Sequence, residues 1–161
     1  MVLAVGFGGC AATRSARTIA VPEKRRFGMN SRPLMTLRLD TATTQNLGET
    51  PQGKRVTYPI VGGVFDGERL RGKVLSGGSD WTLLRPDGAM ELDLRATLET
   101  EDGALVHMTF TGIRDDAHAY FRTLPRFETA APRYAFLNRL LAVGTGEIRA
   151  DGPVHLIEEI L

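Results

Sequence analysis

The chain has 161 residues, of which 42% are hydrophobic and 24% charged, a size and composition typical of one globular domain. No apolar run is long enough for a membrane helix, so we expect no membrane span. The only cysteine, Cys10, leaves no partner for an intrachain disulfide and no cysteine-based metal site, which favours a cytoplasmic location.

The net charge of +1 conceals an uneven distribution. Residues 1–32 hold six basic residues and one acidic residue, a net charge of +5. Residues 33–161 hold 14 basic and 18 acidic residues, a net charge of −4. An acidic body argues against a nucleic-acid-binding surface.

Residues 1–32 are expected to form an unstructured N-terminal extension, with Met29 as the natural start. Their apolar stretch precedes the arginines, which is the reverse of the order in a secretory signal. Export or lipid anchoring through Cys10 is the alternative interpretation. The folded domain is expected to span residues 33–161.

From Pro33 onward, short alternating segments are separated by residues that favour turns. The expected strands, in chain order, cover residues 34–40, 54–60, 64–65, 69–75, 81–85, 90–100, 104–111, 120–127, 140–149 and 154–160. Residues 41–53 are expected to be a loop, and residues 132–138 a short helical turn. This spacing predicts an all-β fold, either a sandwich or a barrel.

The turn at Glu101-Asp102-Gly103 predicts the register of the longest hairpin. A three-residue loop with a left-handed glycine pairs Leu98 with Val106, Ala96 with Met108 and Leu94 with Phe110. This register separates apolar from polar side chains cleanly, whereas a two-residue loop mixes them. We therefore prefer the three-residue loop.

The preceding turn, Pro86-Asp87-Gly88, is ambiguous. Its residues suit a three-residue loop, which would place Asp80 on the apolar face of Leu92 and Leu94. The hydrophobic pattern instead favours a two-residue loop, which would place Asp80 opposite Arg95 on the polar face. The choice decides whether Asp80 faces the interior.

Phosphate-binding, zinc-protease and serine-hydrolase motifs are absent from the sequence. The glycines of residues 61–67 lie between strands, where bulges and turns explain them. His107, His118 and His155 share no metal-ligand spacing. We therefore predict neither a metal site nor a cofactor.

Asp80 and Trp81 are the first candidate site residues, because a carboxylate and an indole follow a glycine loop at a strand start. A turn cap beside a core tryptophan is the structural alternative. Tyr120 and Arg122 share one face of a later strand and could stabilise an oxyanion. A structural ion pair of Arg122 would use the same residues.

The alternating side chains Asp93, Arg95 and His107 form a polar face on the long hairpin. Such a face is usually exposed to solvent. If it lines a lumen instead, these residues could bind a polar ligand, and His107 could act as a general base.

Several ordered stretches of the chain resemble the family catalogued as domain of unknown function 3237. They are residues 62–67, 70–81, 85–88, 120–129 and 134–139, and the resemblance extends from about Leu34 to the C-terminus. Ser76 and Phe136 stand where the family pattern more often has Pro and Trp. The resemblance implies a compact antiparallel β-barrel and carries no assigned catalytic residues.

The sequence thus predicts an all-β protein with a single antiparallel β-barrel of about eight strands. The favoured function is a cofactor-free enzyme of the isomerase, cyclase or hydratase type, with Asp80 transferring a proton and Tyr120 and Arg122 stabilising an oxyanion. The expected ligand is a small polar metabolite in the barrel lumen, bound by Trp81.

Two alternatives remain open. One is a lipocalin-like binding protein without catalysis, and the other is a structural barrel filled by side chains. A homo-oligomer is compatible with each of the three.

Overall fold

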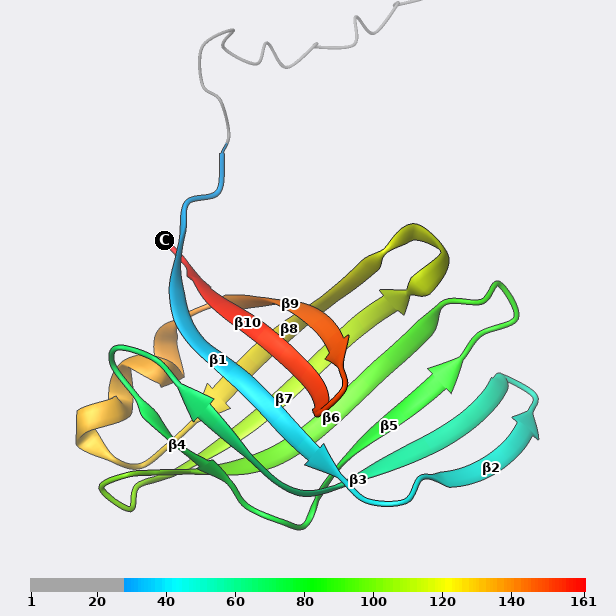
Figure 1. Cartoon of the computed structure of the whole chain (residues 1–161). Coiled ribbons are helices and arrows are strands. Elements are labelled where there is room, and N and C mark those ends of the chain that lie inside the picture. The colour runs from blue at the N-terminus through cyan, green and yellow to red at the C-terminus, as the bar shows by residue number, and fades with distance from the viewer. Residues whose placement is uncertain (1–27) are drawn as a thin grey trace, which may run out of the picture.

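The computed structural model describes residues 28–161, which form one antiparallel β-barrel (Figure 1). The prediction of an unstructured extension falls largely on residues 1–27, which lie outside the described residues. The strands are β1 (Ser31–Thr41), β2 (Gln45–Thr50), β3 (Gly53–Asp66), β4 (Arg71–Val74), β5 (Gly78–Leu84), β6 (Met90–Thr100), β7 (Leu105–Asp115), β8 (Tyr120–Glu128), β9 (Ala142–Arg149) and β10 (Gly152–Ile160). Two 3₁₀ helices cover Asp116–His118 and Pro132–Arg139.

The barrel closes because β1 pairs with β10 on one side and with β3 on the other. Around the circumference the order is β1, β10, β9, β8, β7 and β6, then β4 and β5 in one shared position, then β3. This gives the closed eight-stranded antiparallel barrel that the sequence predicts. Within residues 28–161, no helix is long and apolar enough to cross a membrane.

The segment β2 corrects one prediction. Residues 45–50 are expected to be a loop, but they form a strand antiparallel to the first part of β3. Its burial pattern shows why the apolar pattern missed it, since no residue of β2 is fully buried. Backbone pairing with β3, rather than a buried face, holds this strand.

Both predicted turns decide the register of the sheet. Leu98 pairs with Val106, as predicted for the three-residue loop. In the preceding hairpin, the Arg85 amide donates to Ala89 O at 2.9 Å around a Gly88 with φ of +90°. That loop also has three residues, so the turn chemistry outweighs the hydrophobic pattern and Asp80 faces the interior.

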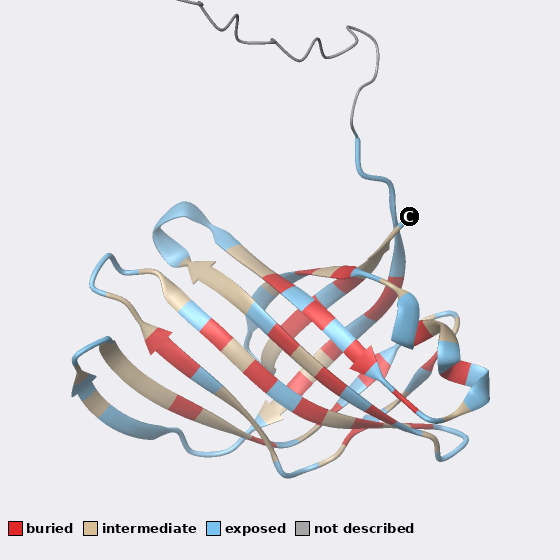
Figure 2. Ribbon diagram, turned by 180° about the vertical axis from the view of Figure 1, so that it is seen from behind, coloured by how far each residue is buried: buried red, intermediate tan, exposed pale blue. Residues whose placement is uncertain are grey.

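Apolar side chains fill one half of the barrel. Figure 2 marks the buried residues along the strands in red. Fully or almost fully buried residues there include Leu37, Leu98, Val106, Met108, Phe110 and Ile157. The helix Pro132–Arg139 lies over this end and buries Tyr134 and Leu137. Tyr134 Oη donates to Asp102 Oδ1 at 2.8 Å, which fixes the helix to the β6–β7 turn.

Gly78, the first residue of β5, lies close to the backbone of β6. A methyl group at Gly78 would lie 2.3 Å from Arg95 O, whereas one at Gly62 would meet nothing nearer than Asp40 Oδ2 at 3.5 Å. We expect Gly78→Ala to lower the free energy of unfolding by about 1–3 kcal/mol, because the backbone of β6 cannot yield without strain. Denaturant unfolding measures the change, with Gly62→Ala as the matched control. Equal stability of the two variants would contradict this packing.

Candidate functional site

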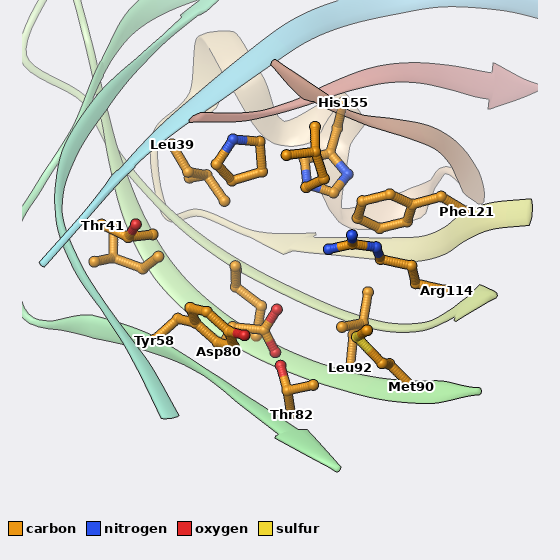
Figure 3. A pocket seen from close by; sticks show the side chains of 14 residues that line it. Leu39, Thr41, Tyr58, Asp80, Thr82, Met90, Leu92, Arg114, Phe121 and His155 are labelled. Atoms are coloured by element: carbon orange, nitrogen blue, oxygen red, sulfur yellow. The ribbon is translucent and has the colours of Figure 1, made fainter. Parts of the chain in front are cut away.

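A cavity of about 220 Å³ occupies the half of the barrel away from the helix Pro132–Arg139 (Figure 3). Its walls are mostly apolar. The residues that line it are Leu39, Thr41, Tyr58, Ile60, Asp80, Thr82, Met90, Leu92, Leu94, Arg114, Phe121, Ile148, Pro153 and His155. At about 30 Å³ for each molecule of liquid water, the cavity has room for roughly seven waters or one small metabolite.

Asp80 enters this cavity from β5. It lies opposite Leu94 on β6 and opposite Tyr58 on β3, so apolar and aromatic side chains flank its carboxylate. The backbone N–H of Asp93 donates to Asp80 Oδ1 at 3.1 Å. Among the residues that the structure describes, no basic side chain forms an ion pair with this carboxylate.

Burial raises the pKa of Asp80 from its ordinary value of 3.8 to about 6. The hydrogen bond from the Asp93 amide and the neighbouring Thr82 hydroxyl oppose this rise, and the charge of the Asp93 carboxylate adds slightly to it. A carboxyl group with a pKa near 6 can accept and return a proton close to neutral pH. This is the property expected of a general acid–base group.

His155 projects into the cavity from β10 (Figure 3). Its side chain is buried between the rings of Phe110 and Phe121, each with its centroid 5.1 Å from the imidazole. Nδ1 has no hydrogen-bond partner. Burial lowers the pKa of His155 from 6.5 to about 4, so the imidazole is neutral at pH 7.

Arg114 is the positively charged side chain among the residues that line the cavity. Nε and Nη2 donate to Asp116 Oδ1 and Oδ2 at 2.7 and 2.8 Å. The guanidinium also lies 5.7 Å from the ring of Phe121. In Figure 3 the guanidinium points toward the middle of the cavity, so Nη1 is the nitrogen left for a ligand.

The structure does not bring Tyr120 and Arg122 to Asp80. Phe121 faces the cavity, and the alternation of β8 therefore turns its two neighbours outward. Arg122 stacks on Tyr120 at 5.3 Å and donates to Phe121 O at 2.9 Å. Tyr120 and Arg122 therefore lie on the other face of the sheet from Asp80. A different pair of side chains would have to stabilise an oxyanion beside Asp80.

Trp81 and Asp93 also face outward and share a groove with Tyr120 and Arg122. Arg95 lies on the same face, with its guanidinium 5.3 Å from the Trp81 ring and 3.3 Å from the Asp93 carboxylate. The groove is on the outside of the sheet, where a ligand would not be enclosed.

His107 lies on a different outer part of the barrel, beside Arg126 and Glu128. The polar stripe of the long hairpin is therefore the outer face of the sheet. Within residues 28–161, no three His, Cys, Asp or Glu side chains gather closely enough to hold a metal ion.

Sequence reasoning missed Tyr58, Arg114 and His155 as lumen residues. Tyr58 and Arg114 each follow the same alternation as inward-facing Ile60 and Phe110, which is a signal that the sequence contains. His155 carries the same signal through its position two residues before Ile157. Only closure of the barrel brings the three strands of these residues around one cavity.

The geometry defines a class: a small antiparallel β-barrel whose interior is packed at one end and hollow at the other, with a partly buried carboxylate in the hollow half. The chain belongs to the family described as "Protein of unknown function (DUF3237)", which matches residues 29–159. This confirms the resemblance seen in the sequence.

Known relatives agree with this assignment. The chain is 36% identical over 143 residues to a UPF0311 protein of Rhodopseudomonas palustris, covering 79% of this chain and 92% of the relative. A β-barrel-like protein from Acinetobacter baumannii superposes with a TM-score of 0.79 at 29% identity, covering 86% of this chain and all of that one.

A more distant structure, described as an enzyme from Penicillium herquei, superposes with a TM-score of 0.71 at 20% identity. The alignment covers 85% of this chain and 98% of that one. At this level of identity the similarity concerns the fold alone.

The partly buried Asp80 and the buried His155 should give opposite pH dependences of stability. Asp80 has a raised pKa, so its contribution is fully present below about pH 4 and is lost as the pH rises through about 6. His155 has a lowered pKa, so its contribution is present above pH 6.5 and is lost as the pH falls through about 4. Each group changes the free energy of unfolding by about 3 kcal/mol at most.

Measurements of the free energy of unfolding at pH 4 and pH 7 separate the contributions of Asp80 and His155. Relative to the unchanged protein, Asp80→Asn should gain stability on going from pH 4 to pH 7, and His155→Phe should gain stability on going from pH 7 to pH 4. Parallel pH profiles for all three proteins would show that neither group is buried as described.

Proposed function

We propose that this protein is a cofactor-free enzyme of the isomerase, cyclase or hydratase type, acting on a small polar metabolite in the barrel lumen. The observation that carries the proposal is Asp80, a carboxylate without an ion-pair partner that lines the barrel cavity, with a pKa raised by burial to about 6. A purely structural carboxylate at this position would be costly without a paired cation.

Asp80 would act as the proton-transfer group. Oδ1 already accepts the amide hydrogen of Asp93, so Oδ2 is the oxygen that would take a proton from the substrate. In an isomerisation the same carboxyl would return this proton to another substrate atom, and no other reactant is required. The nonpolar walls would keep the carboxylate basic.

Arg114 and Tyr58 would stabilise the negative oxygen that forms when the proton leaves. Both side chains line the cavity, and Tyr58 pairs directly with Asp80 across β3 and β5. A positioned N–H or O–H donor is most effective on charge that develops in a water-poor site. These residues replace Tyr120 and Arg122 in the role suggested by the sequence.

The Penicillium herquei neighbour supports an enzymatic use of this barrel only at the level of the fold. Small-molecule binding without catalysis is the second candidate. The apolar cavity wall favours it, since a ligand could bind there by burial alone. The two functions differ in whether Asp80 exchanges a proton with the ligand.

Deuterium incorporation tests the choice. Small molecules retained by the purified protein are identified by mass spectrometry and then incubated with the protein in D₂O. We expect the unchanged protein to add deuterium to the retained molecule, and Asp80→Asn to lower the rate by about 100-fold or more while still binding it. Glu91→Gln, on the outer face, is the matched control for loss of a carboxylate charge.

Arginine variants locate the reaction. Arg114→Ala should lower the rate at least tenfold, because it removes the cation that lines the cavity. A loss with Arg122→Ala and none with Arg114→Ala would move the site to the outer groove. Binding without any incorporation in the unchanged protein would support the second candidate and end the enzymatic proposal.

A further inference from the structure

His155 is a buried polar side chain that the protein leaves without hydrogen bonds. Only 1% of the residue is exposed, and Nδ1 has no partner. Within residues 28–161, the imidazole takes part in no hydrogen bond and no ion pair through either nitrogen. Buried polar groups are normally paired, because an unpaired one costs about 1–3 kcal/mol on average.

The aromatic rings around His155 hold the imidazole in one position but offer it no hydrogen bond. Phe110 contacts one side at a tilt of 46°, and Phe121 presents an edge at 84°. Gly146, which pairs with His155 across β9 and β10, lets the Phe121 ring lie against the backbone, since a methyl group there would be 2.6 Å from the ring. The imidazole is therefore fixed by packing and turned toward the cavity (Figure 3).

The walls near His155 also limit the chemistry of a ligand. Phe110, Phe121 and Leu39 are apolar, and the imidazole is uncharged at neutral pH. A charged ligand group placed against these walls would lose its hydration, and a cation would also lie on the side of the cavity that holds the Arg114 guanidinium. A neutral imidazole offers one donor and one acceptor, which suits an uncharged hydroxyl or carbonyl oxygen.

We propose that His155 is a ligand-binding residue, and that the ligand is a small molecule with an apolar body and an uncharged hydroxyl or carbonyl oxygen that hydrogen-bonds to this imidazole. The opposite end of the ligand then faces Asp80. This inference rests on the lumen being the site of the proposed function. It narrows the polar metabolite of that function to one whose polar groups lie at its ends and whose body is apolar, and it names the residue that orients it.

Nitrogen NMR of the imidazole tests the proposal directly. The full chain is labelled with ¹⁵N-histidine and titrated with cyclohexanol, and in parallel with methylcyclohexane, which has the same number of heavy atoms and no oxygen. We expect cyclohexanol to shift a ring nitrogen of His155 and methylcyclohexane to leave it in place. His107 and His118 lie outside the cavity and serve as internal references.

Variants check that the hydrogen bond contributes to affinity. His155→Phe should weaken cyclohexanol binding by about tenfold, the value of one hydrogen bond, and leave methylcyclohexane binding within twofold. His155→Gln keeps a donor and an acceptor and should recover part of the loss. Equal shifts with both probes, or equal affinities in His155→Phe, would overturn the proposal.

Failure of this proposal can be separated from failure of the proposed function. The imidazole shift does not require Asp80, so it should persist in Asp80→Asn. If deuterium exchange depends on Asp80 but His155 responds to neither probe, only the role of His155 is wrong. If His155 responds to cyclohexanol but no exchange occurs, the lumen binds such molecules without proton transfer.

Discussion

Partial burial of the Asp80 carboxylate without a counter-charge is the constraint on which the account of this barrel depends. The residue faces inward because the Pro86-Asp87-Gly88 loop has three residues, which sets Asp80 opposite Leu94. One amide hydrogen bond, from Asp93, holds it there. That single contact does not compensate for the loss of water, so the carboxylate favours protonation more than an exposed one does.

One half of the barrel interior stabilises the fold, and the other half contains the candidate site. Leu98, Val106 and Met108 fill the end under the helix Pro132–Arg139 and form the packed core. The other end keeps its cavity and contains the partly buried Asp80 carboxylate and the buried His155 imidazole, whose burial is unfavourable. A well-packed half can stabilise a fold whose other half retains costly polar side chains, as binding and catalytic sites commonly do.

Much of the fold follows from local rules that the sequence displays. Alternation and the Glu101-Asp102-Gly103 turn predict the register of β6 and β7 residue by residue. The strand β2 escaped prediction because backbone pairing, and not a buried face, holds it. The sequence left the orientation of Asp80 open, since turn chemistry and hydrophobic pattern disagreed there.

The site was less predictable than the fold for a physical reason. Tyr120 and Arg122 lie beside an inward-facing Phe121, so choosing the polar residues of β8 selected its outer face. Tyr58 and His155 lie almost a hundred residues apart in the sequence, and they share a cavity only after β1 has closed the barrel onto β3 and β10. A local sequence pattern cannot indicate that these two residues line the same cavity.

An experimental structure of the protein with the small molecule that it retains tests the central claim most directly. The account predicts that the molecule lies in the lumen, with one oxygen beside His155 and its reacting end beside Asp80. A molecule seated in the outer groove between Trp81 and Arg122, with an unoccupied lumen, would contradict it.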